Sequence, residues 1–368
     1  MKMELLDIKF SFDCFKVVII KLKNIHSISS YETSEIIKLH IMEKVESYLT
    51  DQNMKSYCSE ANYCINVIIN IKSKEHDITG NLNNLIEYIE NQLKIRVNIG
   101  IGDTFKGFTN ISASNTHAKI CLNYSYIYPE VNIFTMKEVA NWEHNSSDNL
   151  KYLYDTFCTS IKAKDKISTL NSILEIIDTI RKKHISYTCA IKTLTQCVAS
   201  IEDTISDLKI NPDNIIKSDI YTDYNNIDDI MSLKNWFIIV INQIFSQIDE
   251  KKLKKNSDLI KQVKVYISSN ILEPSISLNY VAEAMHISPA YLSRIFKQET
   301  GTTFVEYLMD CKLNIAKDLL LKNSDMKIEE LCNTIGYSSS QYFIRKFKVK
   351  FGITPNEFRL NHIRGNSL

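Results

Sequence analysis

The residue types best suited to chemistry in this sequence are cationic and amide side chains that recur in two similar stretches near the C-terminus. The stretches read SPAYLSRIFKQETG (288–301) and SSQYFIRKFKVKFG (339–352), with Ser, Tyr, Arg, Phe-Lys and Gly at matching places. Residues three or four apart on an α-helix share a face, so each stretch predicts an amphipathic helix with a polar outer face. The outer faces consist of Ala290, Ser293, Arg294 and Lys297 in the first helix, and of Gln341, Ile344, Arg345 and Lys348 in the second. The apolar faces consist of Tyr291, Leu292, Ile295 and Phe296 in the first helix, and of Tyr342, Phe343 and Phe347 in the second.

These outer faces have the chemistry to contact DNA. Arg can grip guanine with two hydrogen bonds and Gln can grip adenine in the same way. We therefore expect Arg294, Gln341 and Arg345 to contact base edges. Lys297 and Lys348 are better placed to contact phosphate, which fixes the position of a protein on DNA without specifying sequence.

A shorter helix and a tight turn precede each basic helix. Apolar residues recur at helical spacing in SLNYVAEAMHIS (277–288) and in KIEELCNTIGYS (327–338), and turns are expected at 286–288 and 336–338. A short helix, a turn of a few residues and an amphipathic basic helix make up a helix-turn-helix. The residues expected to face inward are Leu278, Val281, Ala282 and Met285 in the first unit, and Ile328, Leu331, Cys332 and Ile335 in the second.

The duplication makes this pattern specific, because a core helix easily mimics a single helix-turn-helix but not a matched pair. The upstream parts repeat at an offset of 50 and the downstream parts at 51, so the second turn holds one extra residue. A helix expected over 305–322 is long enough to hold the two units at a fixed separation. Two such units on one chain can enter successive major-groove segments about 34 Å apart. The structural alternative is a helical interaction module that does not bind DNA.

Residues 258–361 resemble the DNA-binding domain of the AraC/XylS family of bacterial transcription regulators. The resemblance rests on 277–308, on KLNIAKDLL (312–320) and on 335–359, which closes with the Gly-x-Thr-Pro-x-x-Phe-Arg pattern typical of that family. It implies an all-α domain in a cytoplasmic regulator, more an activator than a repressor, that binds double-stranded DNA and, as an activator, RNA polymerase. By position, it implies base contacts from Ala290, Ser293 and Arg294, and from Ser340, Gln341 and Arg345.

Two further residues carry specific expectations. Lys312 stands where the family commonly has Arg; Lys keeps the charge but lacks the planar fork, which puts a buried ion pair in doubt. Ile344 is an apolar residue on the outer face of the second basic helix. We expect it to touch a thymine methyl group, because nothing else in the sequence accounts for it.

The N-terminal part alternates strand-like and helix-like patterns, which predicts a sheet with helices packed over it in an α/β or α+β arrangement. Strands are expected at 15–22, 63–71 and 95–102, and helices at 30–49, 82–93 and 116–127. The stretch GIGDTFKG (100–107) contains Gly residues, but Phe105 stands where a dinucleotide fingerprint needs its third Gly. A strand end and a turn are therefore expected there.

The order of these strands and helices resembles the cyclase-like GGDEF domain in fold pattern. The hairpin that carries the catalytic motif in that family corresponds here to Ser59-Glu60-Ala61-Asn62-Tyr63. Its paired carboxylates are reduced to one and its glycines are absent, whereas two-metal chemistry needs carboxylates to hold the ions. We expect a degenerate domain with no catalytic residue, metal site or cofactor. The alternative is a receptor or enzyme for a guanine nucleotide or a cyclic dinucleotide.

Three parts are predicted along the chain. Residues 1–136 form the degenerate GGDEF-like domain with a sensory or dimerising role, 137–255 a helical linker or dimerisation region, and 256–368 the DNA-binding domain. Helices are expected at 170–183, at 190–208 and around Trp236, and the charged stretch 249–258 is the best candidate for a linker. Such regulators often carry a receiver or membrane sensor in front, which implies an effector or an upstream sensor. A homodimer is a further expectation.

Composition and charge support a soluble regulator. No apolar run approaches the roughly 20 residues that span a bilayer, and the N-terminus lacks the pattern of a signal peptide. The nine cysteines include no CxxC pair, so ordinary reduced thiols are expected. The net charge of +1 hides an asymmetry, since 251–368 holds 18 Lys and Arg against 11 Asp and Glu. A basic C-terminal part suits a polyanionic partner, although a solvated surface explains the charge equally well.

Overall fold

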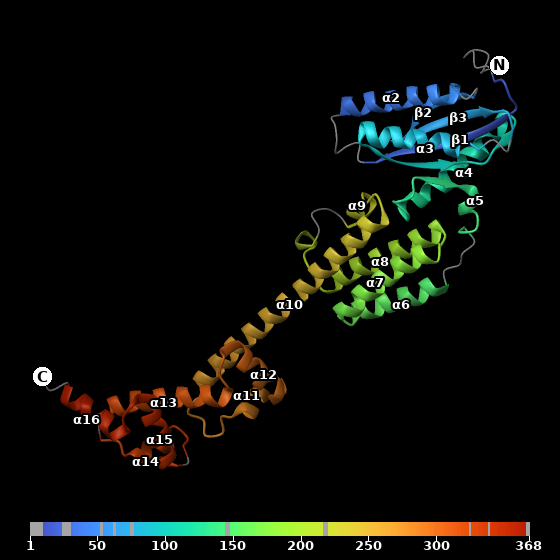
Figure 1. Cartoon of the computed structure of the whole chain (residues 1–368). Coiled ribbons are helices and arrows are strands. Elements are labelled where there is room, and N and C mark those ends of the chain that lie inside the picture. The colour runs from blue at the N-terminus through green and yellow to red at the C-terminus, as the bar shows by residue number, and fades with distance from the viewer. Residues whose placement is uncertain are drawn as a thin grey trace. The chain divides into compact units, whose positions relative to one another are not determined.

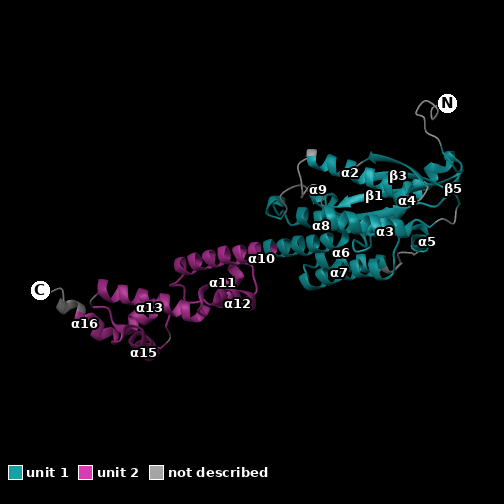
Figure 2. Ribbon diagram, turned by 45° about the horizontal axis from the view of Figure 1, so that its top comes forward, with its two compact units in different colours: residues 1–247 teal, residues 248–368 magenta. Residues whose placement is uncertain are grey.

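The helices and strands group into two compact units, residues 1–247 and 248–368 (Figure 2). The sequence predicted three parts, but the sheet-bearing part and the helices that follow it fall into one unit here. The computed structural model describes residues 10–23, 31–51, 54–61, 64–73, 77–143, 148–215, 220–323, 325–337 and 339–365. Within this described part of the chain, no helix combines the length and apolar character needed to cross a membrane.

The first unit contains a sheet that the described residues build in the order β2-β3-β1-β4-β6, with β5 paired to β1. Neighbouring strands are antiparallel except β4 and β6, which are parallel. The structure confirms the three strands expected from apolar runs, and adds β2, β5 and β6. The strands are β1 (Cys14–Lys23), β2 (Lys55–Ala61), β3 (Cys64–Ile71), β4 (Arg96–Ile101), β5 (Phe105–Lys106) and β6 (Ile133–Thr135).

Helices cover both faces of this sheet, as Figure 1 shows. Successive residues of a strand point to opposite faces, so β1 serves two cores. Val18 and Ile20 pack with α2 (Tyr31–Thr50) and α3 (Thr79–Tyr88) on one face. Val17 and Ile19 pack with α4 (Ile111–Asn123) on the other. The mixed but mainly antiparallel sheet with helices on its faces makes this part α+β.

Gly100 in β4 and Gly102 directly after this strand let α4 lie directly on the sheet. A Cβ added at Gly100 would stand 2.2 Å from the Ala118 carbonyl oxygen, and one at Gly102 would stand 2.0 Å from the Ser114 carbonyl oxygen. The Ser114 hydroxyl sits in the same contact, where it donates to the Asp103 carbonyl and accepts from the Val17 amide. The stretch GIGDTFKG therefore contains the end of β4, as expected. The expected turn is wrong, because β5 follows after three residues and pairs with β1 in the same direction as β4.

Helices make up the rest of the first unit and continue into the second. The expected helices at 170–183 and 190–208 are present, and α6 was missed by the sequence analysis. The charged stretch 249–258, the best candidate for a linker, begins beside the boundary between the two units at 247/248 and is helical. Lys, Glu and Asp with no Gly or Pro are compatible with a continuous helix. The helices are α5 (Met136–Val139), α6 (Asp148–Lys162), α7 (Lys166–Lys182), α8 (Tyr187–Asp207), α9 (Ile220–Asn225) and α10 (Ile230–Ser269).

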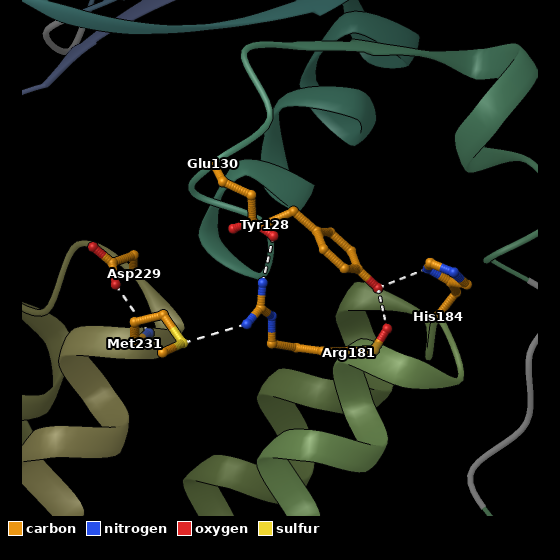
Figure 3. A network of polar contacts seen from close by, with 6 residues as sticks. All are labelled: Tyr128, Glu130, Arg181, His184, Asp229 and Met231. Carbon is orange, nitrogen blue, oxygen red and sulfur yellow. Dashed lines mark hydrogen bonds and ion pairs between the residues drawn. The ribbon is translucent and has the colours of Figure 1, made fainter.

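A polar network joins the sheet-bearing part to these helices (Figure 3). The Tyr128 hydroxyl donates to the Arg181 carbonyl at 2.9 Å and lies 2.8 Å from His184 Nδ1. The Arg181 guanidinium pairs with Glu130, and the His184 ring stacks on Trp142 with centroids 4.7 Å apart. Burial raises the pKa of Tyr128 to about 12. These contacts explain why residues on both sides of position 136 belong to one compact unit.

The second unit is entirely helical in the residues described. The last part of α10 is followed by two short helices, two longer ones that carry the repeated stretches, a connecting helix and a terminal helix. They are α11 (Leu278–Ala284), α12 (Pro289–Thr300), α13 (Phe304–Lys322), α14 (Ile328–Thr334), α15 (Ser340–Phe351) and α16 (Pro355–Gly365).

Candidate nucleic-acid interface

The first repeated stretch folds into α12, and local signals define both ends of this helix. Ser288 is the N-cap, and its hydroxyl accepts a hydrogen bond from the Tyr291 amide at 3.2 Å. Pro289 occupies the first turn, where its missing N–H carries no penalty. Gly301 ends the helix with φ of 75°, a left-handed conformation that glycine adopts without strain.

The second repeated stretch folds into α15, which has the same kinds of residue at its two ends. The Ser339 hydroxyl accepts from the Tyr342 amide at 3.3 Å, and Gly352 ends the helix with φ of 81°. The buried faces also correspond. Leu292, Ile295 and Phe296 are buried in α12, and Phe343 and Phe347 are buried in α15.

A short helix and a turn precede each of these two helices, and the two turns share the same pattern of hydrogen bonds. In the first turn, His286 N donates to Glu283 O and Ile287 N donates to Ala282 O, both at 3.0 Å. In the second, Gly336 N donates to Asn333 O at 3.2 Å and Tyr337 N donates to Cys332 O at 2.8 Å. The two donors and two acceptors of the second turn lie 50 positions after those of the first turn. The structure therefore contains two helix-turn-helix units, α11–α12 and α14–α15.

The two turns differ in the residue at the left-handed position. His286 adopts φ of 55° and Gly336 adopts φ of 72°. His286 thus has a structural role in the turn, where a turn was expected at 286–288. The extra residue of the second unit lies between Gly336 and Ser339, in a turn whose Ser338 is outside the described residues.

The outer faces of the two helices are largely open to solvent. Ser340 and Ile344 are half-buried. The other residues expected to contact DNA are exposed: Ala290, Ser293, Arg294, Lys297, Gln341, Arg345 and Lys348.

Two residues of α15 lie differently from their expected faces. Ile344 packs against the second core cluster, so core packing accounts for its apolar side chain. The reason given for a thymine contact therefore does not hold. Tyr342, expected on the apolar face, is 40% exposed. In both cases the residue lies near the border between the buried and the exposed face, and helical periodicity alone does not locate this border.

A tyrosine lies under the arginine of each helix, one turn earlier in the chain. The Arg294 guanidinium is 5.4 Å from the Tyr291 ring centroid, and the Arg345 guanidinium is 5.9 Å from that of Tyr342. A guanidinium over an aromatic face is attracted by the ring quadrupole. These tyrosines were part of the repeated pattern, but the sequence did not assign them this role.

The connecting helix α13 contributes to the cores of both units. Phe304 belongs to the first core and Leu313, Ala316 and Leu320 belong to the second, while Ile315 touches both. The second core is rich in aromatic rings, with Phe347 4.5 Å from Phe351 between ring centroids. A shared helix with two packed faces holds the two helix-turn-helix units together, as its length predicted.

Lys312 lies on the inner side of α13. Lys312 is 8% exposed. In the described part of the chain, no carboxylate lies within ion-pair distance of its ammonium group. Burial lowers its pKa, since the charged form loses solvation. A Cβ added at Gly336 would meet the Lys312 Nζ at 2.9 Å. Glycine thus leaves room for the Lys312 ammonium group beside the turn, and it adopts the left-handed conformation without the strain that His286 carries in the first turn.

A repeated capping box follows α12 and α15, the helices of the two repeated stretches, and the sequence analysis missed it. The Glu306 carboxylate accepts from the amide and hydroxyl of Thr303, and the Glu357 carboxylate accepts likewise from Thr354. These hydrogen bonds lower the pKa of both glutamates. The Thr-x-x-Glu spacing of a capping box recurs at an offset of 51 and would have located the starts of α13 and α16.

Two helix-turn-helix units on one chain, each with an open basic helix, define the class of this C-terminal unit. Residues 281–361 match the family model described as "Helix-turn-helix domain". This match agrees with the resemblance of residues 258–361 to the AraC/XylS family. Together they identify the unit as a helix-turn-helix domain of the AraC type.

Two proteins to which this chain is similar are named as transcription regulators. One similar protein is the uncharacterized HTH-type transcriptional regulator YtdP of Bacillus subtilis, 26% identical over 307 residues, which are 80% of this chain and 38% of that protein. Another is the transcriptional activator RhrA of Rhizobium meliloti, 32% identical over 26% of this chain and 31% of that protein. The matched part of the chain thus spans about a third of the length of each of these relatives.

Solved structures are similar to part of this chain. The C-terminal domain of AraT, a response regulator from Geobacillus stearothermophilus, is 33% identical over 28% of this chain and 84% of that one, with a TM-score of 0.27. The described residues bring together no group of three or more His, Cys, Asp or Glu side chains that could hold a metal ion.

Proposed function

We propose that this protein is a sequence-specific DNA-binding transcription regulator that reads two adjacent major-groove segments with α12 and α15 of one chain. The observation that carries the proposal is the pair of exposed faces with Arg and Lys at equivalent positions of two helix-turn-helix units. A recognition helix places exposed side chains in the major groove, and a second unit on the same chain supplies the contacts that other proteins obtain from a partner subunit.

The proposed contacts follow from side-chain chemistry. Bidentate contacts to bases are assigned to Arg294 and Arg345, with Gln341 suited to adenine. Ala290, Ser293 and Ser340 are assigned to shorter-range contacts with base edges. Lys297 and Lys348 are assigned to phosphate.

Selection of binding sites from a random DNA pool by the full-length protein tests the proposal. Two conserved blocks about one helical turn apart are expected, since both units face DNA from one chain. A single block would mean that one unit only positions the other on the backbone. Weak binding with no enriched motif would favour the alternative of a helical protein-interaction adaptor.

Lys297→Ala and Lys348→Ala should each weaken binding to selected and unrelated duplexes by about the same factor. A lysine that neutralises phosphate releases counterions on binding, so its loss should reduce the slope of log Kd against log salt by about 1. Fluorescence anisotropy titrations at several salt concentrations measure this slope. Val349→Ala is a matched control on α15, because Val349 is 79% exposed and carries no charge. A change in base preference with no change in slope would contradict the phosphate assignment.

The direction of regulation and the role of the first unit are part of the proposal. We assign activation, with RNA polymerase as partner, because RhrA is named as an activator and the resemblance implies the same. Residues 1–136 are assigned a sensory or dimerising role as a degenerate GGDEF-like domain, and 137–255 a role in dimerisation. The support for the first assignment is the β2–β3 hairpin at the predicted position, whose Asn62 and Tyr63 lie outside the described residues.

A cavity beside this hairpin favours a second candidate function, which is the binding of a guanine nucleotide or a cyclic dinucleotide. It has a volume of about 730 Å³ and lies between the sheet face and α4. Its lining combines apolar side chains of the sheet and of α4 with polar side chains that include one cation. This suits a ligand with a planar base and an anionic group. The polar lining residues are Ser59, Asn66, Ser112, Asn115, Lys119 and Asn123.

Binding without catalysis is proposed for this cavity. The one carboxylate of the hairpin, that of Glu60, lies 2.5 Å from Lys38 Nζ, which also pairs with Glu35 at 2.7 Å. A carboxylate neutralised by a buried lysine is a poor metal ligand. Calorimetry of the full-length protein with GTP and cyclic dinucleotides tests the candidate, with Lys119→Ala expected to abolish the heat of binding. No heat with any of these ligands would exclude it.

A further inference from the structure

The hydroxyl of Tyr291 ties the first recognition helix to α10. It donates a hydrogen bond to Asn256 Oδ1 at 2.8 Å. Asn256 lies on α10 and is only 7% exposed, so water does not readily replace the tyrosine as its partner. Breaking this bond leaves a buried polar group unpaired, which makes the bond a strict constraint on the ring.

The Tyr291 ring is also held by packing. It is half-buried and packs against the first core cluster, to which α10, α11, α12 and α13 contribute residues. The ring is therefore held both by packing against the core and by the hydrogen bond of its hydroxyl group. Arg294 rests over this ring at 5.4 Å from the centroid. An exposed arginine otherwise samples many rotamers, and a fixed aromatic platform reduces the ordering that DNA binding requires.

The second recognition helix has the same pair of residues without this support. Arg345 lies 5.9 Å from the Tyr342 centroid, and Lys346 lies over the same ring at 5.5 Å. Tyr342 is 40% exposed, and its hydroxyl makes no hydrogen bond to any residue that the structure describes. The repeated Tyr-x-x-Arg pattern thus has different tertiary surroundings in its two copies.

The geometry points to Asn256 and Tyr291 as positioning residues that hold Arg294 in the orientation in which it contacts a base. This inference rests on the proposed function. It makes discrimination by the first unit depend on a residue of α10 that does not itself reach DNA. Discrimination by the second unit has no corresponding dependence on the hydroxyl of Tyr342.

Tyr291→Phe in the full-length protein tests the inference, because it removes the hydroxyl and keeps the ring under Arg294. Binding to the selected duplex should weaken about three- to tenfold, the loss expected when a side chain must be ordered on binding. Preference should relax only at the base that Arg294→Ala also affects, and the salt slope should stay unchanged. Asn256→Leu breaks the same hydrogen bond from the other side and should have the same effect.

The double variant Tyr291→Phe/Arg294→Ala separates positioning from general stability. If Tyr291 acts through Arg294, its replacement should have no further effect once the arginine is absent. A loss that persists in the Arg294→Ala background, or that is equal on all duplexes, would overturn the inference. Tyr342→Phe is the matched control and should change affinity less than twofold. If the wild-type protein selects no motif or Arg294→Ala changes nothing, the proposed function itself fails, and the two failures remain distinguishable.

Discussion

Replacing Arg294 with Ala should weaken binding of the full-length protein to its selected duplex by about 1–3 kcal/mol, or roughly 5- to 150-fold. The physical reason is the loss of two hydrogen bonds to one base, which neither water nor the remaining Ala side chain restores at that position. The preference for one base pair should relax while the other positions keep theirs. Arg345→Ala should have an effect of similar size at a base pair in the other block. Competition titrations with single-base variants of the duplex measure both.

Arg294→Lys is the control for charge. Lysine keeps the positive charge but lacks the planar fork, so it should retain most of the salt dependence and lose most of the discrimination. Equal weakening of Arg294→Ala on every duplex would show that the arginine contacts phosphate instead. That outcome would leave DNA binding intact and remove the assignment of base contacts.

Replacing Phe347 with Ala should reduce the free energy of unfolding of the C-terminal unit by about 3–5 kcal/mol. Phe347 is fully buried, and its ring lies within 6 Å of three other phenylalanines, at centroid distances of 5.7 Å from Phe343, 4.5 Å from Phe351 and 5.7 Å from Phe358. Truncation leaves a cavity among aromatic rings that can close only if α15 and α16 move closer together. Urea unfolding followed by far-ultraviolet circular dichroism measures the change.

The chain supplies an internal control for this measurement. Its two tryptophans, Trp142 and Trp236, both lie within 1–247, so their fluorescence reports on the first unit. The tryptophan transition should stay in place while the helical signal of the second unit moves to lower urea. Val349→Ala, at an exposed site on the same helix, should change stability by less than about 0.5 kcal/mol. An unchanged circular dichroism transition in Phe347→Ala would contradict the assigned core.

Local patterns predicted the elements of the C-terminal unit well and those of the first unit less completely. Ser288, Pro289 and Gly301 bound α12 through contacts within a few residues, which is why the sequence reveals them. The strand β2 was missed because SYCSEA alternates weakly and lies at the edge of the sheet, where most of its side chains are not buried. Tyr342 was placed on the apolar face because a helical period does not show how far the neighbouring core extends.

The sequence by itself determined that this protein carries two helix-turn-helix units with matching basic faces, because helix period, caps and turns depend on residues close together in the chain. Only the tertiary structure decided which of the two arginines rests on a fixed platform. Asn256 and Tyr291 are 35 positions apart, and no local pattern links them. The same holds for Lys312 and Gly336, and for the contacts of Tyr128 with residues beyond position 180. Such contacts depend on how separate helices pack, and packing is decided by the shape and volume of all the side chains that share a core.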